Sequence, residues 1–331
     1  MILNPAIIAL IGGGLLVSGF ALYAAYNGLL IIRHWDLNSG SERQLQLERK
    51  TYLISTIFGF LLLFEFASLF LFAYTADHMH DLFVGAMCAA GSLNVNDYGY
   101  STLVVKIITF LLCGVWAIVN YTDNQAADYP MIRAKYKLLL YVTGALLLET
   151  FLQCRYFLCL EADVITSCCG TLFSLEAQTV SGDLSALSPY GTMVAFYVGV
   201  ALTTRAGAHF LFTGRAAGTF SIFAAASMVL GLMAVISCIS VYYYELPTHH
   251  CPFCILQKEY GYIGYPLYFS LFMAGISGLG VGLVELYKGE PSGTNFVRIQ
   301  KRLTVLCISG YLLFSGIAAY PMIFSDFILE S

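Results

Sequence analysis

Charge is what this sequence has least of. Only 11% of its 331 residues are charged, whereas 59% are hydrophobic. A soluble domain of this length needs far more charge to cover its surface. The mean hydropathy of +0.76 agrees with this interpretation. We therefore expect a membrane protein whose surroundings are lipid, and we expect no nucleic-acid partner.

Two absences argue against haem. Cys251 and Cys254 have the C-x-x-C spacing, but Ile255 follows the second cysteine where covalent haem attachment needs a histidine. A b-type haem held between membrane helices needs two axial ligands, and His209 is the one histidine inside an apolar run. A haem-bearing cytochrome is therefore not expected.

Eight apolar runs are long enough to cross a bilayer, which takes about 20 residues each. No basic segment precedes the first run, so we interpret it as a true span and not as a signal peptide. The sequence thus predicts an all-α polytopic membrane protein with eight transmembrane helices. The runs lie at about 5–33, 51–76, 101–121, 137–160, 189–213, 219–244, 263–287 and 303–327.

The basic residues predict the orientation. Thirteen of the 16 lysines and arginines lie in or beside the loops that follow the first, third, fifth and seventh runs. The other three are Lys106, Arg155 and Lys258. Because loops rich in Lys and Arg stay on the cytoplasmic side, both termini are expected to face outward. We predict a multi-pass protein of the inner (cytoplasmic) membrane with periplasmic N- and C-termini.

The cysteines follow the same division. Five lie in predicted outward loops, and no inward loop contains one. Outward thiols meet an oxidising compartment, so disulfide chemistry is the first interpretation. The five outward cysteines are Cys88, Cys168, Cys169, Cys251 and Cys254.

The chain also resembles itself. Residues 88–106 and 254–271 each begin with a cysteine, continue through a polar stretch and reach Tyr-Gly-Tyr before an apolar run. We favour a duplication, with a first four-helix repeat at 1–160, an outward loop at 161–188 and a second repeat at 189–331. The alternative is coincidence between two aromatic-rich interface segments.

Three interpretations compete for the C-x-x-C pair. A metal could use Cys251, Cys254 and either His249 or His250. Two adjacent histidines cannot easily join one tetrahedral site, however, and there is no second C-x-x-C, so we predict no metal. A structural disulfide over so short a ring would constrain the unfolded chain little.

We favour redox activity. The pair lies at the predicted start of the seventh span, where the helix dipole stabilises a thiolate. Lys258 follows Cys254 by four residues, which on a helix places its ammonium group one turn away on the same face. Pro252 stiffens the loop between the two cysteines.

The segment "CPFCILQK" at 251–258 resembles the C-x-L-C-x-x-Q-R signature of the disulfide bond formation protein B family. These quinone reductases and the fold-related vitamin K epoxide reductases are four-helix membrane proteins that pass electrons from a thiol partner to a quinone. The resemblance implies that Cys251 and Cys254 are the pair nearest the quinone. Gln257 and Lys258 stand at the positions of the family's Gln and Arg.

This chain departs from the family in three ways. Lys replaces Arg at position 258, eight spans replace four, and no cysteine follows the eighth span. Cys88, Cys168 and Cys169 are therefore the candidates for a second redox group. Because vicinal cysteines are awkward partners for each other, Cys168 or Cys169 would pair with Cys88 or relay to the C-x-x-C pair. Unpaired or structural roles stay open.

Several tyrosines and histidines near these cysteines are further candidates for binding a quinone or a metal. Tyr260, Tyr262 and Tyr265 could line a quinone pocket together with Gln257, although interface aromatic belts explain tyrosines there equally well. His78 and His80 could bind a metal or take up protons, but a solvated loop is the simpler interpretation.

Glu65, Lys106 and Glu149 lie inside apolar runs, where each is costly to bury. Pairing of Lys106 with one of the two carboxylates is the structural explanation for these residues. A proton path for quinone chemistry is the functional one, and we prefer the structural explanation.

The leading hypothesis is a membrane thiol–disulfide oxidoreductase that exchanges electrons between a periplasmic dithiol or disulfide protein and a membrane quinone. Cys251 and Cys254 would be the redox pair, and Lys258 would stabilise the thiolate. The rival is a non-enzymatic membrane subunit of an electron-transfer or assembly complex, with disulfides that serve only as structural links.

Overall fold

The computed structural model describes residues 3–36, 39–126, 128–161, 164–166, 187–286, 293–325 and 327, and this part of the chain consists of helices joined by turns and loops. Among these residues no strand forms, and the extended pairing found is a single bridge between Val84 and Ile165. The predicted all-α class is confirmed.

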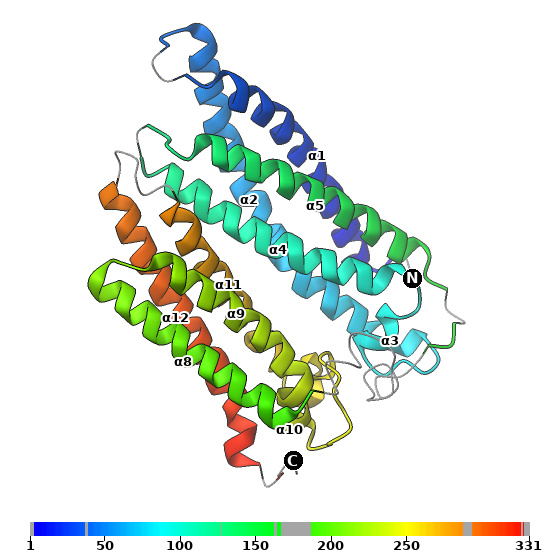
Figure 1. The fold of residues 1–331 in the computed structure, drawn as a ribbon. Coiled ribbons are helices and arrows are strands. Elements are labelled where there is room, and N and C mark those ends of the chain that lie inside the picture. The colour runs from blue at the N-terminus through cyan, green and yellow to red at the C-terminus, as the bar shows by residue number, and fades with distance from the viewer. Residues whose placement is uncertain are drawn as a thin grey trace. The chain divides into compact units, whose positions relative to one another are not determined.

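Eight helices are long and apolar enough to cross a membrane, which confirms the eight predicted runs and indicates a multi-pass membrane protein. They are labelled in Figure 1. Their bounds are α1 Pro5–His34, α2 Glu42–His78, α4 Tyr98–Asp123, α5 Ile132–Leu158, α8 Pro189–Thr213, α9 Ala217–Ala234, α11 Gly264–Glu285 and α12 Gly293–Phe324. A π-helical turn at Val235–Ile239 continues α9 into α10, Ser240–Tyr244.

Several helices begin before the predicted run. α2 starts at Glu42, because the polar stretch "ERQLQLERK" consists of straight-chain residues that favour helix even in water. α5 starts at Ile132, so Lys135 lies inside the helix and not in the loop where the sequence placed it. Its Nζ is 2.9 Å from Asp123 Oδ2, and both side chains are fully buried.

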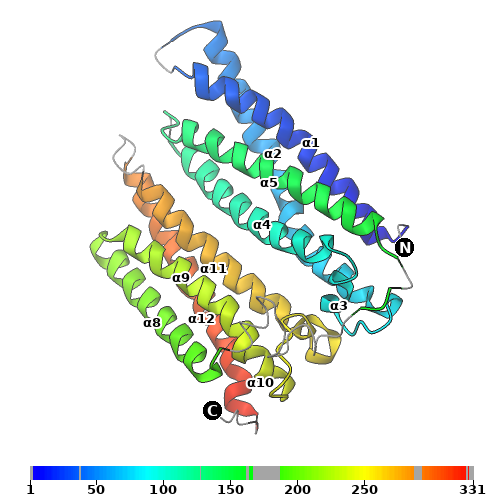
Figure 2. The same ribbon diagram turned by 45° about the vertical axis from the view of Figure 1, so that its right-hand side comes forward.

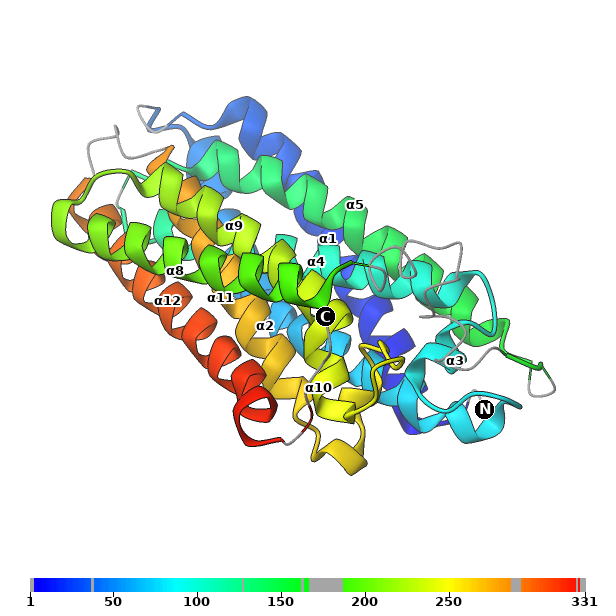
Figure 3. The same cartoon turned by 60° about the horizontal axis from the view of Figure 1, so that its bottom comes forward.

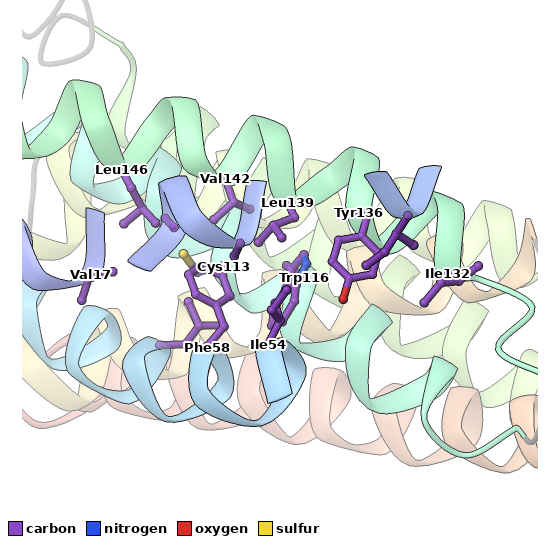
Figure 4. Close-up of a cluster of buried hydrophobic side chains, with 14 of the residues drawn as sticks. Val17, Ile54, Phe58, Cys113, Trp116, Ile132, Tyr136, Leu139, Val142 and Leu146 are labelled. Carbon is purple, nitrogen blue, oxygen red and sulfur yellow. The ribbon is translucent and has the colours of Figure 1, made fainter. Parts of the chain in front are cut away.

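The first compact unit contains α1, α2 up to Thr75, α4 and α5. Figure 2 shows α1, α4 and α5 running side by side. Its core is a cluster of aromatic and aliphatic side chains contributed by all four helices (Figure 4). At its centre the rings of Phe58 and Trp116 meet edge to face at 4.9 Å. The unit comprises Met1–Thr75, Asn96–Leu160 and Leu286–Phe296.

The second compact unit contains α8, α9, α10, α11 and α12 from Val297 onward (Figure 3). Small residues bring its helices together: a Cβ on Gly278 of α11 would lie 2.3 Å from Ala224 Cβ of α9. Such close approach is typical of helix pairs in membranes. The unit comprises Ala76–Val95, Glu161–Glu285 and Val297–Ser331.

The segment 76–95 therefore belongs to the second unit, although the predicted duplication assigned it to the first repeat. It contains the end of α2, a 3-10 turn at His80–Leu82 and the short helix α3, Ala89–Leu93. This assignment matters because it places Cys88 in the same unit as Cys251 and Cys254. The duplication itself and the side on which the termini lie stay predictions.

Candidate functional site

Three cysteine sulfurs gather in the second unit. Cys88 Sγ and Cys251 Sγ are 3.6 Å apart, and Cys254 completes a group in which all three sulfurs lie within 4.8 Å of one another. All three side chains are buried. We refer to Cys88, Cys251 and Cys254 as the three-cysteine cluster. The sequence did not determine whether Cys88 lies near the C-x-x-C pair, and the structure places it there.

Cys88 is positioned by the start of α3. Its sulfur accepts a hydrogen bond from Ala90 N–H at 3.4 Å, as an N-cap residue does. The preceding backbone amide, Ala89 N–H, donates to Asp77 Oδ1 at 3.2 Å. The carboxylate at the end of α2 therefore holds the backbone on which Cys88 sits.

The C-x-x-C loop is held by two tyrosines. The Tyr244 hydroxyl donates to the carbonyl of Cys251 at 2.6 Å and accepts from Ile255 N–H at 2.8 Å. The Tyr268 hydroxyl donates to the carbonyl of Pro252 at 2.7 Å. α10 and α11 thus fix the loop through its backbone.

Gln257 joins the two cysteine segments. Its Nε2 donates to Asp77 Oδ1 at 3.1 Å and to the carbonyl of Met87 at 3.0 Å. Asp77 therefore supports both segments at once, through Ala89 and through Gln257. The sequence marked Gln257 for cofactor binding, whereas in the structure its amide links the loop to the residue before Cys88.

The predicted helical alignment of Lys258 with Cys254 is wrong. Cys254 and Lys258 lie in two separate 3-10 turns, Cys254–Leu256 and Lys258–Tyr260, and Gln257 between them is extended. The i, i+4 alignment on one helix therefore does not form, and the Lys258 side chain is exposed. α11 begins only at Gly264, so the cysteine pair does not occupy a helix N-terminus.

The two adjacent histidines point to different partners. His249 Nε2 lies 3.4 Å from Cys254 Sγ, close enough to take the proton of that thiol. His250 is buried, and its Nδ1 lies 3.1 Å from the carbonyl of Ile236. His249 is therefore a candidate base for the Cys254 thiol, a role that the sequence did not assign.

The cluster has the ligand set of a soft metal ion. A tetrahedral zinc ion with Zn–S bonds of about 2.3 Å separates its sulfurs by about 3.8 Å. The 3.6 Å between Cys88 and Cys251 is close to that separation and far longer than a disulfide bond of about 2.05 Å. The sequence did not predict a metal site. Among the described residues, however, Cys88 supplies a third sulfur ligand beside the C-x-x-C pair.

A pocket of about 640 Å³ is lined in part by Tyr260, Gly261 and Ile263, which follow the C-x-x-C loop in the chain. Tyr243 and Tyr260 line it from one side, and Leu312, Gly316 and Tyr320 of α12 line it from the other. Its walls are mostly apolar, and three tyrosines, Tyr243, Tyr260 and Tyr320, are among the lining residues. An apolar cavity with few polar groups is typical of a small-molecule site.

Tyr260 connects this cavity to the cysteine loop. Its ring packs against the ring of Tyr244 with centroids 4.8 Å apart. Burial raises the pKa of the Tyr260 hydroxyl, and the nearby Cys254 and Glu259 raise it further. The phenol therefore keeps its proton at neutral pH.

The other predicted residues fall elsewhere. Among the described residues that line the cavity, Gln257, Tyr262 and Tyr265 are not present. Tyr262 and Tyr265 instead contact each other, with ring centroids 6.2 Å apart. Cys168 and Cys169 lie outside the described residues.

His78 and His80 lie at the end of α2 and in the turn that follows it. His80 Nε2 is 3.2 Å from Asp81 Oδ1, and its Nδ1 contacts the carbonyl of Asp77.

Asp77, Tyr244 and Tyr268 support the cysteine segments and were not predicted from the sequence. Only Asp77 left a signal, as an acidic residue directly after an apolar run.

No protein-family model, curated protein or solved structure matches the chain. The resemblance to the disulfide bond formation protein B family therefore rests on residues 251–258 and stays a prediction. The function is therefore inferred from the chemistry of the three-cysteine cluster and of the pocket at Tyr260.

Proposed function

We propose that this protein is a membrane thiol–disulfide oxidoreductase that passes electrons from a dithiol protein through the three-cysteine cluster to a quinone. The observation that carries the proposal is the 3.6 Å separation of Cys88 Sγ and Cys251 Sγ beside Cys254. A third sulfur at this distance allows a disulfide to move within the protein, which a lone C-x-x-C pair cannot do.

Internal exchange changes no oxidation state. The Cys88 thiolate attacks Cys251 of a Cys251–Cys254 disulfide, forms a Cys88–Cys251 disulfide and releases Cys254 as a thiolate. A partner dithiol then reduces the Cys88–Cys251 disulfide by two electrons and becomes a disulfide itself. All three cysteines of the cluster are then thiols.

The quinone reoxidises the C-x-x-C pair. Cys251 and Cys254 together give two electrons and two protons, so that one disulfide and one quinol form. His249 takes the thiol proton of Cys254, from which its Nε2 lies 3.4 Å away. Loss of that proton produces the thiolate, which is the reactive form.

The cavity beside Tyr260 suits the quinone ring. A volume of about 640 Å³ and mostly apolar walls fit a ring with two carbonyl groups and the start of an isoprenoid tail. The protonated Tyr260 hydroxyl is a donor for one of those carbonyl oxygens. Exposed apolar side chains on α12, among them Leu312 and Leu313, continue the lining toward lipid.

The excess of basic residues in four of the predicted loops supports an orientation with the cluster on the outer side of the inner membrane. The dithiol partner would then be a periplasmic protein. Proteins in such an oxidising compartment form disulfides from their cysteine pairs.

The test is quinone reduction by the purified protein in lipid nanodiscs, with dithiothreitol as the dithiol and a short-chain ubiquinone as the acceptor. We expect turnover by the wild type and a loss of at least about 100-fold in C251S, C254S and the double variant. Cys154→Ser, in the first unit, is the matched control and should keep the wild-type rate.

A C251S/C254S variant as fast as the wild type would disprove the proposal. A wild type that does not reduce quinone and purifies only with other membrane proteins would instead support the non-enzymatic subunit. These outcomes separate the two hypotheses with one preparation.

A second candidate function is the binding of a soft metal ion, favoured by the third thiol and by His249 beside Cys254. Copper(I) and zinc both accept such ligands. The reduced protein would be titrated with each metal and followed by thiolate-to-metal absorption. If this function holds, the wild type should bind one equivalent of the metal, and C88S should not bind it. Tight binding without quinone turnover would replace the redox proposal.

A further inference from the structure

The first unit buries a charged group that the thiol chemistry does not use. Lys106 of α4 contacts Glu149 of α5, with Nζ and Oε1 2.5 Å apart. Glu65 of α2 lies beside them, and Ser68 bridges the group by accepting from Lys106 Nζ at 3.1 Å and donating to Glu65 Oε1 at 3.0 Å. All three ionisable side chains are at least nine-tenths buried.

The charges of this group do not cancel if it holds two carboxylates and one ammonium. Lys106 neutralises one carboxylate, and a second one would leave a net negative charge among apolar side chains, where an unpaired ion is strongly disfavoured. The other fully buried lysine, Lys135, is already paired with Asp123 at 2.9 Å. One carboxyl group therefore carries a proton.

The contacts assign that proton to Glu65. Lys106 stands against Glu149, which favours the ionised form of Glu149. Glu149 Oε2 is buried and receives no hydrogen bond from the donors of the described residues. The side chains of Glu65 and Glu149 are hydrogen-bonded to each other, which requires a proton on one of them, and Glu65 is the one that Lys106 does not contact as an ion pair.

We propose that Glu65 and Glu149 form a proton-binding site among the membrane-spanning helices, in which one exchangeable proton is held on Glu65 beside Lys106. The titratable groups of the described residues that face this pair are Lys106 and Cys113, both from α4. The site is independent of the three-cysteine cluster, since none of its residues belongs to the second unit. It therefore stands or falls apart from the redox proposal.

The test counts protonated carboxyl groups by infrared difference spectroscopy between neutral and strongly alkaline pH, on the full chain in nanodiscs. The carbonyl stretch of a protonated carboxyl is distinct from that of a carboxylate and shifts in D₂O. We expect one such group in the wild type and none in E65Q, because the amide of E65Q still donates to Glu149 but cannot titrate.

Two further variants make the count specific. In E149Q we expect no protonated group, because Glu65 then ionises to pair with Lys106. In Lys106→Met we expect two, because neither carboxylate keeps a cation. Glu42→Gln, at the exposed start of α2, is the control and should leave the count at one. Identical carbonyl bands in the wild type and in a folded E65Q would overturn the proposal.

Discussion

The two units join their helices by different means. In the first, α4 and α5 bury two ion pairs, Lys106 with Glu149 and Lys135 with Asp123. In the second, no lysine or arginine is among the buried described residues, and glycines of α11 lie against α9 instead. Gly275 and Gly278 each leave room for a side chain of α9, Met228 and Ala224 respectively.

The difference shows two solutions to one problem. Between membrane helices, burial of apolar surface gives little drive, so either polar bonds or close packing must hold them together. Charges fix which helices meet but are costly when a partner is lost, whereas small residues tolerate no added atoms. Each unit should therefore be sensitive to a different kind of substitution.

The largest effect is expected from Lys135→Met in the first unit. It removes the cation opposite Asp123 and leaves a fully buried carboxylate unpaired, which costs about 3–5 kcal/mol of unfolding free energy. Denaturant unfolding in micelles measures the loss, and hydrogen exchange should locate it in α4 and α5. The control Lys137→Met changes an exposed residue of the same helix and should stay within about 0.5 kcal/mol.

The matching substitution in the second unit is Gly278→Ala. Its methyl group would lie 2.3 Å from Ala224 Cβ, so α9 and α11 must separate at a cost of about 1–3 kcal/mol. Thermal unfolding and hydrogen exchange over both helices measure this. Gly218→Ala in α9 meets nothing within 4 Å and should leave stability unchanged or slightly raised. Equal losses in both variants would contradict the close-packing account.

The third prediction concerns the cysteine loop. Tyr244→Phe removes the hydroxyl that bonds Cys251 and Ile255, which leaves two buried backbone groups unsatisfied at about 1–3 kcal/mol. Local opening should become about tenfold more frequent or greater. Alkylation of Cys251 by a small maleimide, followed by mass spectrometry, gives the rate. Tyr242→Phe, two residues earlier, should label as slowly as the wild type.

The smallest effect is expected from Gln257→Leu. This variant loses the hydrogen bonds to Asp77 and Met87, at about 1 kcal/mol, and frees the loop from the segment that carries Cys88. The yield of the Cys88–Cys251 disulfide under mild oxidation should fall several-fold. Lys258→Gln, at an exposed side chain, should give the wild-type yield. A reduced yield in Lys258→Gln alone would restore the role that the sequence gave to this lysine.

The helices were predictable because their signal is long. A run of about 20 apolar residues has few alternatives in a membrane protein, and all eight runs form helices. The ends were less predictable, since polar residues such as those at 42–50 continue a helix beyond its apolar run. Lys135 shows the consequence, because a residue counted as part of a loop is a buried partner of Asp123.

The site was predictable only where the signal was local. C-x-x-C spacing identified Cys251 and Cys254, and Cys88 was a candidate, but its 3.6 Å approach to Cys251 depends on a fold that brings distant segments together. Lys258 was misplaced because one extended residue, Gln257, interrupts the expected helix. Tyr244 and Tyr268 act through hydroxyl bonds to backbone carbonyls, which no spacing rule reveals.

Cys88 has two tasks in this fold, since the sulfur that faces Cys251 is also the cap of α3. A hydroxyl can accept the same bond from the Ala90 amide, whereas it cannot form a disulfide. Serine at this position should therefore keep the cap of α3 and remove the ability to form a disulfide with Cys251. Alanine would remove both, so the difference between the two variants measures how much α3 contributes by itself.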